Sequence, residues 1–473
     1  MFEELLQPSR LTGLSANLYE VTQTESFAGA SFAHVNIDLL NQFGIEHHAF
    51  ISGENLSLIS GNRPSPKLVP ISTIYAGHQF GIYTSKLGDG RVHIIGDIRP
   101  SNESCWEIQL KGAGATPFAR GNNGHMSLAE AIIEYLGCEA MSGLGIPGTR
   151  GLALIDYSGN RVNNEQASCQ SILIRTAETH LRFGHFEYLH NQGDISSLKE
   201  LADHVIAQHY PELMSINSAD RYLQFLYAVT YRTAKLLAQW QSVGFVHSVM
   251  NTDNMSIIGI TMDFGVYGFM QGYNPNYSPN ENDDQDRYAF DQQVDVARWN
   301  CLALAEALTE LLPDKRIPAK LLRYYRKSYA ENYQLLMQRK LGLLESHVED
   351  AVLINSLLGL LRQQHIDYTR FFRLLCHFES DGIETIILEK VARHEAFRTW
   401  FDNYRLRLAS EKTHPEQRKT MMLASNPKYI LRQSIIDHVV HHAEQHGNFN
   451  FLHELLMVIQ SPFEEHESHE HLA

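Results

Sequence analysis

The segment 246–265, VHSVMNTDNMSIIGITMDFG, brings an amide and two carboxylates close together in the chain. Asn254 and Asp263 carry hard oxygen atoms of the kind that Mg²⁺ prefers. The apolar connector between them, MSIIGITM, predicts a small hairpin with both side chains at its ends, close enough to share one metal ion. Asp253 adds a carboxylate beside Asn254, which could accept a proton or only cap a turn.

The spacing of these residues is that of a protein kinase with one part missing. Kinases carry H-R-D-x-x-x-x-N before D-F-G; the first Asp orients the acceptor hydroxyl, and the Asn and second Asp bind metal. Counted from His247, the Asn position is Asn254, and Asp263 opens the D-F-G triplet. The kinase base position is Val249, whose side chain cannot accept a proton. Such a site needs another base, and Asp253 is the neighbouring candidate.

A lysine at a strand end and a glutamate on the next helix would complete a site of this kind. Apolar and polar residues alternate in CWEIQLKGAG (105–114), which predicts a strand that ends at Lys111. The following segment SLAEAIIEYLGCEAM (127–141) has an apolar face and predicts the helix, with Glu134 in its middle. Both residues could instead be solvated surface charges, and we keep that interpretation for Glu130 and Glu139.

A glycine-rich turn provides a candidate phosphate contact. In LGDGRVHIIGDI (87–98), Gly88 and Gly90 precede a predicted strand and are followed by Arg91. Glycines let backbone N–H groups approach a phosphate, and an adjacent Arg can add a bidentate contact. The same Gly-Asp-Gly sequence is also a common hairpin turn.

Two arginines form a second candidate phosphate site. Arg175 and Arg182 lie in ILIRTAETHLRFGHFEYLH (172–190), after a predicted strand. They could clamp phosphate oxygens, or they could pair with the nearby acidic residues Glu178 and Glu187. The histidines of this segment, His180 and His185, have no metal-ligand spacing, so we interpret them as structural or rim residues.

The patterns divide the chain into a strand-containing part and a helical part. Strand-like stretches and Gly-rich turns extend to about residue 180. Helical periodicity dominates afterwards. The predicted helices cover residues 222–240, 297–311, 319–344, 350–378 and 428–459, and a polar loop is predicted at 274–287. We therefore predict an α+β chain with a β-containing lobe (1–180), a helical lobe that bears segment 246–265 (181–312) and a helical C-terminal extension (313–473).

Composition argues against several classes of protein. The formal net charge of −15 argues against nucleic-acid binding by phosphate neutralisation, although a local basic cleft stays open. The five cysteines are scattered, odd in number and without C-x-x-C spacing, which is typical of a reducing compartment without structural zinc. The N-terminus has no apolar leader, and no apolar run is long enough to span a membrane. We expect a cytoplasmic monomer.

These residues carry a resemblance to a known family. The chain resembles the selenoprotein O family, the kinase-like protein adenylyltransferases, over most of residues 75–300 and again near the C-terminus. The similar blocks are YAGHQFG (75–81), LGDGR (87–91), EIQLKGAGATPFAR (107–120), EYL with EAM (134–141), LRFGHFE (181–187), VMNTDNMSI (249–257), RYAF with WN (287–300) and NPKYILR (426–432).

The resemblance implies a fold and an activity. Members resemble protein kinases but bind ATP in a flipped orientation, and they transfer AMP to Ser, Thr or Tyr hydroxyls of proteins. It implies a two-lobed protein-kinase-like fold for this chain and protein substrates, with the chain itself as one candidate. Flipping the nucleotide presents the α-phosphate, so the usual base position can be apolar when another carboxylate lies near the incoming hydroxyl.

The resemblance also implies a role for each candidate residue. Asp253 would accept the proton, Lys111 would contact the phosphates, and Glu134 would orient Lys111. Asn254 and Asp263 would bind Mg²⁺ or Mn²⁺. The remaining nucleotide-binding positions would be Gly88, Gly90, Arg91, Asn123, Gly124 and, for the terminal phosphates, Arg175 and Arg182.

Three positions depart from the family pattern. Asn123-Gly124-His125 stands where members typically have Asp-Gly-Arg, so a carboxylate that would contact the nucleotide is an amide here. Ser248 replaces the usual Gly, a change that we expect to matter little. Members commonly end with a redox-active Cys or selenocysteine, whereas the last cysteine here is Cys376. We therefore do not expect redox control through a C-terminal disulfide.

Two other functions stay open at this point. In one, Asp253 substitutes for the missing base and the γ-phosphate moves, as in an ordinary kinase. In the other, the chain is a pseudokinase scaffold that binds nucleotide without catalysis. Asn123 and His125 favour the scaffold, whereas the joint presence of Lys111, Asn254 and Asp263 favours an enzyme.

Overall fold

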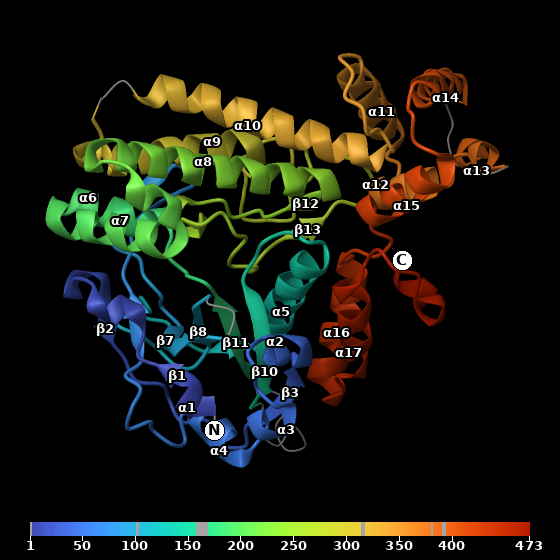
Figure 1. Ribbon diagram of the computed structural model, residues 1–473. Coiled ribbons are helices and arrows are strands. Elements are labelled where there is room, and N and C mark those ends of the chain that lie inside the picture. Colours follow the sequence, from blue (N-terminus) through green and yellow to red (C-terminus); the bar gives the residue numbers. More distant parts are fainter. Residues whose placement is uncertain (1, 101–103, 158–168, 314–316, 380–381, 390–393) are drawn as a thin grey trace.

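A computed structural model describes residues 2–100, 104–157, 169–313, 317–379, 382–389 and 394–473. The chain combines helices with an antiparallel sheet, so the predicted α+β class is confirmed. The sheet lies in the N-terminal part; the helices α6 to α15 lie on one side of it, whereas α16 and α17 lie beside α5 (Figure 1). Among the described residues, no helix is long and apolar enough to cross a membrane.

The sheet places the strand that ends at Lys111 beside the strand that carries Arg175. Its main path runs β2-β4-β7-β8-β11-β10-β3, with β1 and β9 paired to β7 and β11. The predicted strand 105–114 is confirmed as β8, which pairs with β7 at Lys111↔Val92 and with β11 at Gln109↔Arg175. The strands are β1 (Leu6–Gln7), β2 (Tyr19–Val21), β3 (Ser31–Val35), β4 (Ile71–Thr73), β7 (Val92–Ile98), β8 (Trp106–Lys111), β9 (Met126–Ser127), β10 (Arg150–Asp156) and β11 (Gln170–Ala177).

The long helix of the sheet region, α5 (Leu128–Gly143), begins with a capping box between Ser127 and Glu130. One face of α5 packs on β10 and β11, and α16 and α17 pack on it from another side. The prediction that Glu139 is a solvated charge is wrong: its side chain is buried and accepts two hydrogen bonds from Arg150. Because α17 covers this part of α5, Glu139 also accepts a hydrogen bond from Gln460. Glu130 remains exposed.

Short helices lie near the N-terminus, and the longer helices follow the sheet. The predicted helices 350–378 and 428–459 are each two helices in the structure, because His365 and Gly447 adopt left-handed conformations that end α11 and α16. The helices are α1 (Phe2–Leu5), α2 (Ile37–Gln42), α3 (His47–Phe50), α4 (Gly53–Ile59), α6 (Phe183–Asn191), α7 (Ile195–His209), α8 (Ser218–Val243), α9 (Gln293–Ala307), α10 (Ile317–Lys340), α11 (Asp350–Gln364), α12 (Tyr368–Leu375), α13 (Ile383–Glu389), α14 (His394–Ala409), α15 (Pro415–Ser425), α16 (Gln433–His446) and α17 (Asn450–Gln460).

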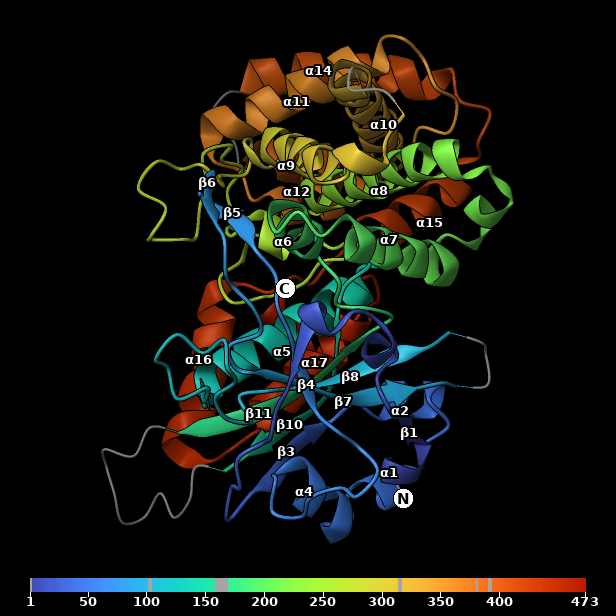
Figure 2. The ribbon, with the colours of Figure 1, turned by 90° about the vertical axis from the view of Figure 1, so that its left-hand side faces the viewer.

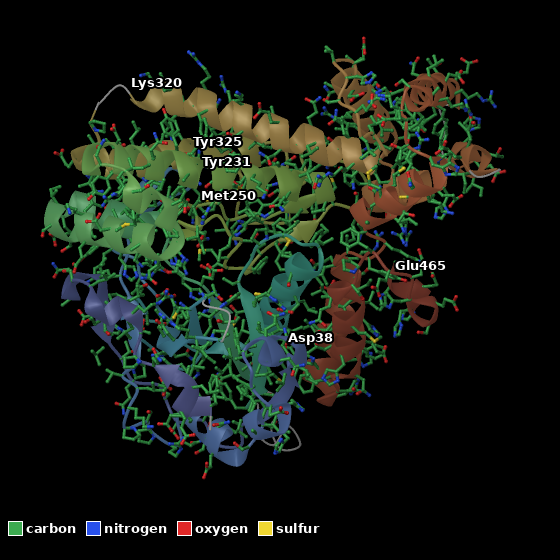
Figure 3. The ribbon with its side chains drawn as sticks, in the orientation of Figure 1. Asp38, Tyr231, Met250, Lys320, Tyr325 and Glu465 are labelled. Atoms are coloured by element: carbon green, nitrogen blue, oxygen red, sulfur yellow. The ribbon has the colours of Figure 1, made fainter. Side chains whose placement is uncertain are left out.

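One apolar core joins the sheet region to the helices. It extends from α5 through α6, α7, α8 and α9 and includes residues of α16 and α17. Met250 and Tyr325 are buried in this core, while Lys320 lies exposed near the start of α10 (Figure 3). The segment that follows α8 is therefore held between the sheet region and the helices.

A small hairpin extends from the sheet region to the helices. It consists of β5 (Gly77–Gln79) and β6 (Ile82–Thr84). In Figure 2 it lies beside α6 and α9, and β5 contacts α6 and the short helix η5 (Thr252–Asn254). Strand β5 belongs to the YAGHQFG block (75–81), and the hairpin covers part of segment 246–265.

Candidate active site

Four of the predicted residues form a buried network of charges. Lys111 Nζ lies 2.5 Å from Glu134 Oε2 and 3.4 Å from Asp263 Oδ1. Arg175 Nη1 lies 2.7 Å from Glu134 Oε1 and 2.5 Å from the same Asp263 oxygen. Arg175 is completely buried, and its Nε donates to Gln109 on the adjacent strand. The strand β8, the helix α5 and the strand β11 thus each provide one side chain that contacts another member of the network.

Arg182 connects this network to segment 246–265. Its Nη1 donates to the backbone oxygen of Asp253 (2.7 Å) and to Asn254 Oδ1 (3.3 Å), and it also contacts Asp263 Oδ2. The side-chain oxygens of Asn254 and Asp263 therefore both contact this one nitrogen atom. Asn254 is fixed from its other end, because its Nδ2 donates to the carbonyl of Val249.

The structure describes all of residues 254–263, and they do not form the predicted hairpin. Ser256 forms a bridge with Arg182, and Thr261 forms one with Gly148, so the connector pairs with two other parts of the chain. Asp263 itself has a left-handed backbone with φ of 60°, an uncommon conformation for a residue other than glycine. Asn254 and Asp263 nevertheless come together, because both contact Arg182.

The network fixes the ionisation of its carboxylates. Burial alone would raise the pKa of Asp263, but Arg182, Arg175 and Lys111 outweigh it and hold that pKa well below its ordinary value. Burial is opposed in the same way at Glu134, where Lys111 and Arg175 lower the pKa. Both side chains are therefore carboxylates at neutral pH. Lys111, Arg175 and Arg182 all contact Asp263, which is therefore the shared centre of the network.

A cavity of about 520 Å³ opens at this network. Arg175 Nη2 and Arg182 Nε are buried and have no hydrogen-bond partner. Buried donors are normally satisfied, so two open donors on guanidinium groups that line a cavity indicate a site for an anionic ligand. Seven predicted residues line the cavity: Gly90, Arg91, Asn123, Gly124, Arg175, Arg182 and Asp263.

The glycine turn has a packing role next to the cavity. A Cβ at Gly88 would lie 2.6 Å from the Phe118 ring, and one at Gly90 would lie 2.9 Å from the Phe118 carbonyl. The turn therefore lets the 115–124 loop approach β7 closely. Arg91 lines the cavity but also donates to Glu130 at 3.0 Å and to the carbonyl of His125 at 3.3 Å.

The loop that departs from the family pattern is an ordered turn. Asn123 Oδ1 accepts a hydrogen bond from the backbone of His125, and His125 Nε2 lies 2.9 Å from Glu25 Oε2. Gly124 has φ of 73°, and a Cβ there would collide with the Gly114 backbone. The amide at position 123 thus stabilises the wall of the cavity.

Asp253 lies next to the network but outside the cavity lining. Its carboxyl group is largely buried; Oδ1 has no hydrogen-bond partner, and Oδ2 accepts a long hydrogen bond from Gln79 at 3.4 Å. Burial raises the pKa of Asp253 to about 6, although Arg182 opposes the increase. A carboxyl group with this pKa can change ionisation near neutral pH, as a proton acceptor requires.

The structure answers the open questions about segment 172–190. Arg175 and Arg182 do not pair with Glu178 or Glu187, because both guanidinium groups turn toward Asp263. His180 and His185 are buried and structural, as predicted. His180 Nδ1 lies 2.9 Å from Glu107 Oε2, and His185 Nδ1 accepts the backbone N–H of Arg182.

The sequence reasoning missed several residues of the site. Tyr75 stacks under the Arg182 guanidinium, whose Cζ lies 4.8 Å from the ring centroid. Asp89 lies 3.7 Å from Arg182 Nη2, and both Phe118 and Arg120 line the cavity. The blocks YAGHQFG, LGDGR and EIQLKGAGATPFAR contain these residues, but spacing alone assigned them no role.

Comparison with known proteins establishes the family of this chain. A family model described as "Protein adenylyltransferase SelO" matches residues 2–460. This chain belongs to the SelO family. The prediction of the family is thereby confirmed, as is the prediction of an enzyme of the nucleotidyltransferase class.

Bacterial relatives of this SelO-family chain are similar over nearly their whole length. A "Protein nucleotidyltransferase YdiU" of Myxococcus xanthus is 41% identical over 442 residues, which cover 93% of this chain and 90% of the relative. A protein of the same name from Thioalkalivibrio sulfidiphilus is 44% identical and covers 87% of this chain and 84% of its own. One from Vibrio vulnificus is 40% identical and covers 98% and 95%.

Proposed function

We propose that this chain transfers AMP from ATP to Ser, Thr or Tyr hydroxyls of proteins, including its own. The observation that carries the proposal is the pair of buried guanidinium groups, Arg175 and Arg182, whose open donors lie at a cavity beside Asp263. A triphosphate would satisfy these donors and form ionic contacts with both guanidinium groups. Family membership supports nucleotidyl transfer as the reaction class.

The proposed arrangement is a two-lobed, kinase-like enzyme with flipped ATP. We infer a nucleotide-binding lobe at residues 1–180, a helical lobe at 181–312 and a helical extension at 313–473. The adenosine would lie toward the 118–125 loop, and the terminal phosphates would contact Arg175 and Arg182. Gly90, Arg91, Asn123 and Gly124 would form the wall around the nucleotide, with Gly88 supporting the turn.

In the proposed reaction, the acceptor hydroxyl oxygen attacks the α-phosphorus, and the bond to the β-phosphate oxygen breaks. Asp253 accepts the hydroxyl proton, and pyrophosphate leaves. Arg175 and Arg182 stabilise the charge that develops on the leaving group. Glu134 holds Lys111 in place, so that its ammonium group can contact a phosphate oxygen. An apolar Val249 is compatible with this scheme, because the base is four residues further along.

The convergence of Asn254 and Asp263 fits a Mg²⁺ or Mn²⁺ ion. Their oxygens meet at Arg182 Nη1, so they already face one positive charge. Among the described residues, no group of three or more His, Cys, Asp or Glu side chains could hold a metal. We therefore propose that Asn254 and Asp263 bind the ion together with phosphate oxygens, as is common for Mg²⁺. The ion would neutralise triphosphate charge.

Two alternatives make different predictions about the product. An ordinary kinase would move the γ-phosphate, with Asp253 as its base. A pseudokinase scaffold would bind ATP and transfer nothing. The open donors on Arg175 and Arg182 favour the first proposal over a kinase, because a pyrophosphate leaving group has more charge to stabilise at that end.

Incubation with Mg²⁺ and ATP labelled at either the α- or the γ-phosphate separates the three functions. The acceptors are the protein itself and a cell extract. We expect stable protein label from α-labelled ATP only, and its loss in Asp253→Asn. The exposed substitution Asp284→Asn serves as the matched control and should keep the label. Label from the γ-position alone would establish a kinase, and binding without transfer of either label would favour the scaffold.

We further propose that the enzyme acts on proteins as a cytoplasmic monomer, without a nucleic-acid or membrane partner. Cys138, Cys301 and Cys376 are buried thiols, and burial raises the pKa of each. Such unreactive thiols are typical of a reducing compartment. The test is size-exclusion chromatography with light scattering on the active fraction, where activity confined to a dimer would contradict the monomer.

A further inference from the structure

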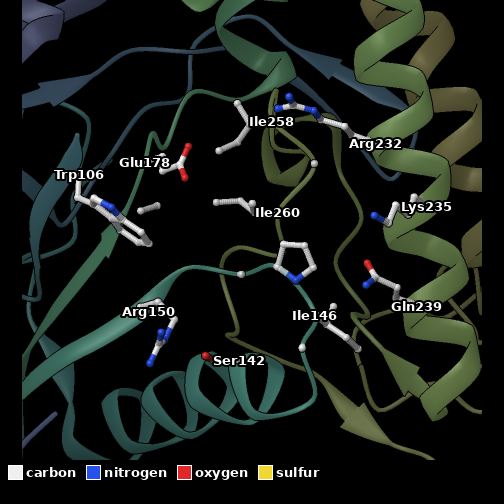
Figure 4. Close-up of a pocket in the computed structure, with 15 residues that line it drawn as sticks. Trp106, Ser142, Ile146, Arg150, Glu178, Arg232, Lys235, Gln239, Ile258 and Ile260 are labelled. Atoms are coloured by element: carbon white, nitrogen blue, oxygen red, sulfur yellow. The ribbon is translucent and has the colours of Figure 1, made fainter. Parts of the chain in front are cut away.

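A second cavity lies behind the charge network. It shares no lining residue with the cavity at Arg175 and Arg182, which we call the nucleotide cavity. We call it the rear cavity; its volume is about 490 Å³. Figure 4 shows that α8 provides one wall, while the end of α5 and the segment that follows it provide another. The segment 258–260 also lines it. The rear cavity is nearly as large as the nucleotide cavity, so a small organic molecule can fit.

The α8 wall presents the positive charges of Arg232 and Lys235, and the charge of Arg232 helps to lower the pKa of Glu178, which lines the same cavity. Arg232, Lys235 and Gln239 have the spacing i, i+3 and i+7 and therefore share one face of the helix (Figure 4). Arg232 donates to the carbonyl of His209 at 2.9 Å, and its guanidinium lies over the Tyr210 ring, with Cζ 3.9 Å from the centroid. Among the described residues, no carboxylate lies within ion-pair distance of Arg232 or Lys235. In a chain with a net charge of −15, such a wall favours an anion.

The rest of the rear cavity is mainly apolar. Trp106 lies across the cavity from α8, and Ile146, Ile258 and Ile260 also line it (Figure 4). Arg150 also lines it, but both of its donated hydrogen bonds go to Glu139, which neutralises its charge. A ligand that fits both walls needs a flat apolar body and an anionic group at the end that faces α8.

A negative charge in the rear cavity limits where the anionic group of a ligand can lie. The carboxylate of Glu178 also lines the rear cavity and is half exposed. Its Oε2 lies 3.7 Å from His209 Nδ1. A ligand anion would be repelled by Glu178 and attracted by Lys235, so these two residues fix the orientation of the ligand.

We propose that the rear cavity binds a small molecule that joins an aromatic ring to a phosphate or carboxylate. Lys235 and Arg232 would contact the anionic group, and Trp106 would stack on the ring. This binding site is separate from the nucleotide cavity, and ligand binding there does not require the reaction proposed above.

The walls of the rear cavity also connect it to the charge network. The carbonyl of Pro147, a lining residue, accepts hydrogen bonds from the backbone N–H and the hydroxyl of Thr261, at 2.8 and 3.0 Å. Thr261 precedes Asp263 by two residues. A ligand packed on Pro147, Ile258 and Ile260 would therefore bias the position of Asp263, and binding would change nucleotide affinity. This second step rests on the proposed function, whereas ligand binding itself does not.

Binding is tested by titrating the full-length protein with naphthyl phosphate and measuring heat release. We expect one site per chain that persists with excess α,β-methylene-ATP and Mg²⁺, because that nucleotide fills the other cavity. Affinity should fall about tenfold or more in Lys235→Glu and also fall in the milder Lys235→Gln. Lys320→Glu makes the same charge change at an exposed position of another helix and should bind normally. Naphthol and inorganic phosphate should each bind more weakly than the combined molecule.

Two outcomes would overturn the binding proposal: absence of binding at accessible concentrations, or equal binding by Lys235→Glu and Lys320→Glu. The coupling is tested separately by measuring ATP affinity with and without saturating naphthyl phosphate. We expect a change of about fivefold or more. An unchanged ATP affinity would show that the coupling is wrong while the binding site stands. Failure of ATP to bind at all would overturn the proposed function and leave the rear cavity unaffected.

Discussion

Gly77 of the β5–β6 hairpin lies directly against Asp253. A Cβ at Gly77 would be 2.6 Å from Asp253 Oδ1 and 2.9 Å from Asp253 Cβ. The hairpin thus covers the proposed base and removes it from water, which accounts for the raised pKa of Asp253. Thr252 Oγ1 also accepts the backbone N–H of His78, so the hairpin is fixed to η5 by a hydrogen bond.

Gly77→Ala should reduce turnover and leave nucleotide binding nearly unchanged. The added methyl group cannot fit unless Asp253 shifts, and a small displacement of a catalytic group can reduce the rate about a hundredfold. The measurement is kcat together with the dissociation constant for ATP. Gly53→Ala is the matched control, because a Cβ there would meet nothing within 4 Å. Equal activity of the two variants would contradict the position assigned to Asp253.

The rate of transfer should rise with pH through about 6. Burial raises the pKa of Asp253 to that value, and a base must be ionised to accept a proton, so activity is lost as the pH falls. The measurement is kcat at saturating nucleotide and metal from about pH 5 to pH 8. Gln79→Leu removes a hydrogen bond that lowers this pKa and should shift the midpoint upward. A flat profile in both proteins would exclude Asp253 as the base.

Lys111→Met should reduce turnover by about a hundredfold or more, because the lysine contacts charge that develops during transfer. The variant also leaves Glu134 with Arg175 as its remaining ion-pair partner. Transfer rate and melting temperature should be measured together, with Lys320→Met as the exposed control. If Lys111→Met melts at a much lower temperature but its folded fraction is fully active, the lysine is structural.

Ser248→Gly should stabilise the protein. Ser248 has φ of 66°, and its buried hydroxyl has no hydrogen-bond partner. Relief of the left-handed strain is worth about 1 kcal/mol, somewhat offset by the greater freedom of glycine in the unfolded chain. Thermal unfolding should therefore shift upward by a degree or two. Ser57→Gly, in the middle of α4, should shift it downward; a decrease for both would contradict the strain argument.

Sequence reasoning found the contacts that local patterns determine. The alternation in β8 and the apolar face of α5 were enough to pair Lys111 with Glu134, since a strand end and the next helix are neighbours in the chain. The kinase-like spacing likewise brought Asn254 and Asp263 together. The prediction of a hairpin between them is wrong, because residues of the connecting segment pair with Arg182 and Gly148, which belong to distant parts of the chain.

The remaining contacts depend on pairings between distant segments. Arg175 reaches Asp263 because β11 lies beside β8 in the sheet, and no spacing in the sequence encodes that order. Glu139 was misjudged because α17 returns from the end of the chain to cover α5. The contact between Gly77 and Asp253 has the same origin, since the hairpin crosses from the sheet region to the helices.

The most direct test of the account is a crystal structure of the protein with α,β-methylene-ATP and Mn²⁺. The account predicts that β- and γ-phosphate oxygens accept hydrogen bonds from Arg175 Nη2 and Arg182 Nε, which are buried guanidinium donors without hydrogen-bond partners. It also predicts that the α-phosphate is the phosphate nearest to Asp253, with Mn²⁺ bound by Asn254 and Asp263. A complex with the γ-phosphate nearest to Asp253 and the nucleotide away from both arginines would contradict adenylyl transfer.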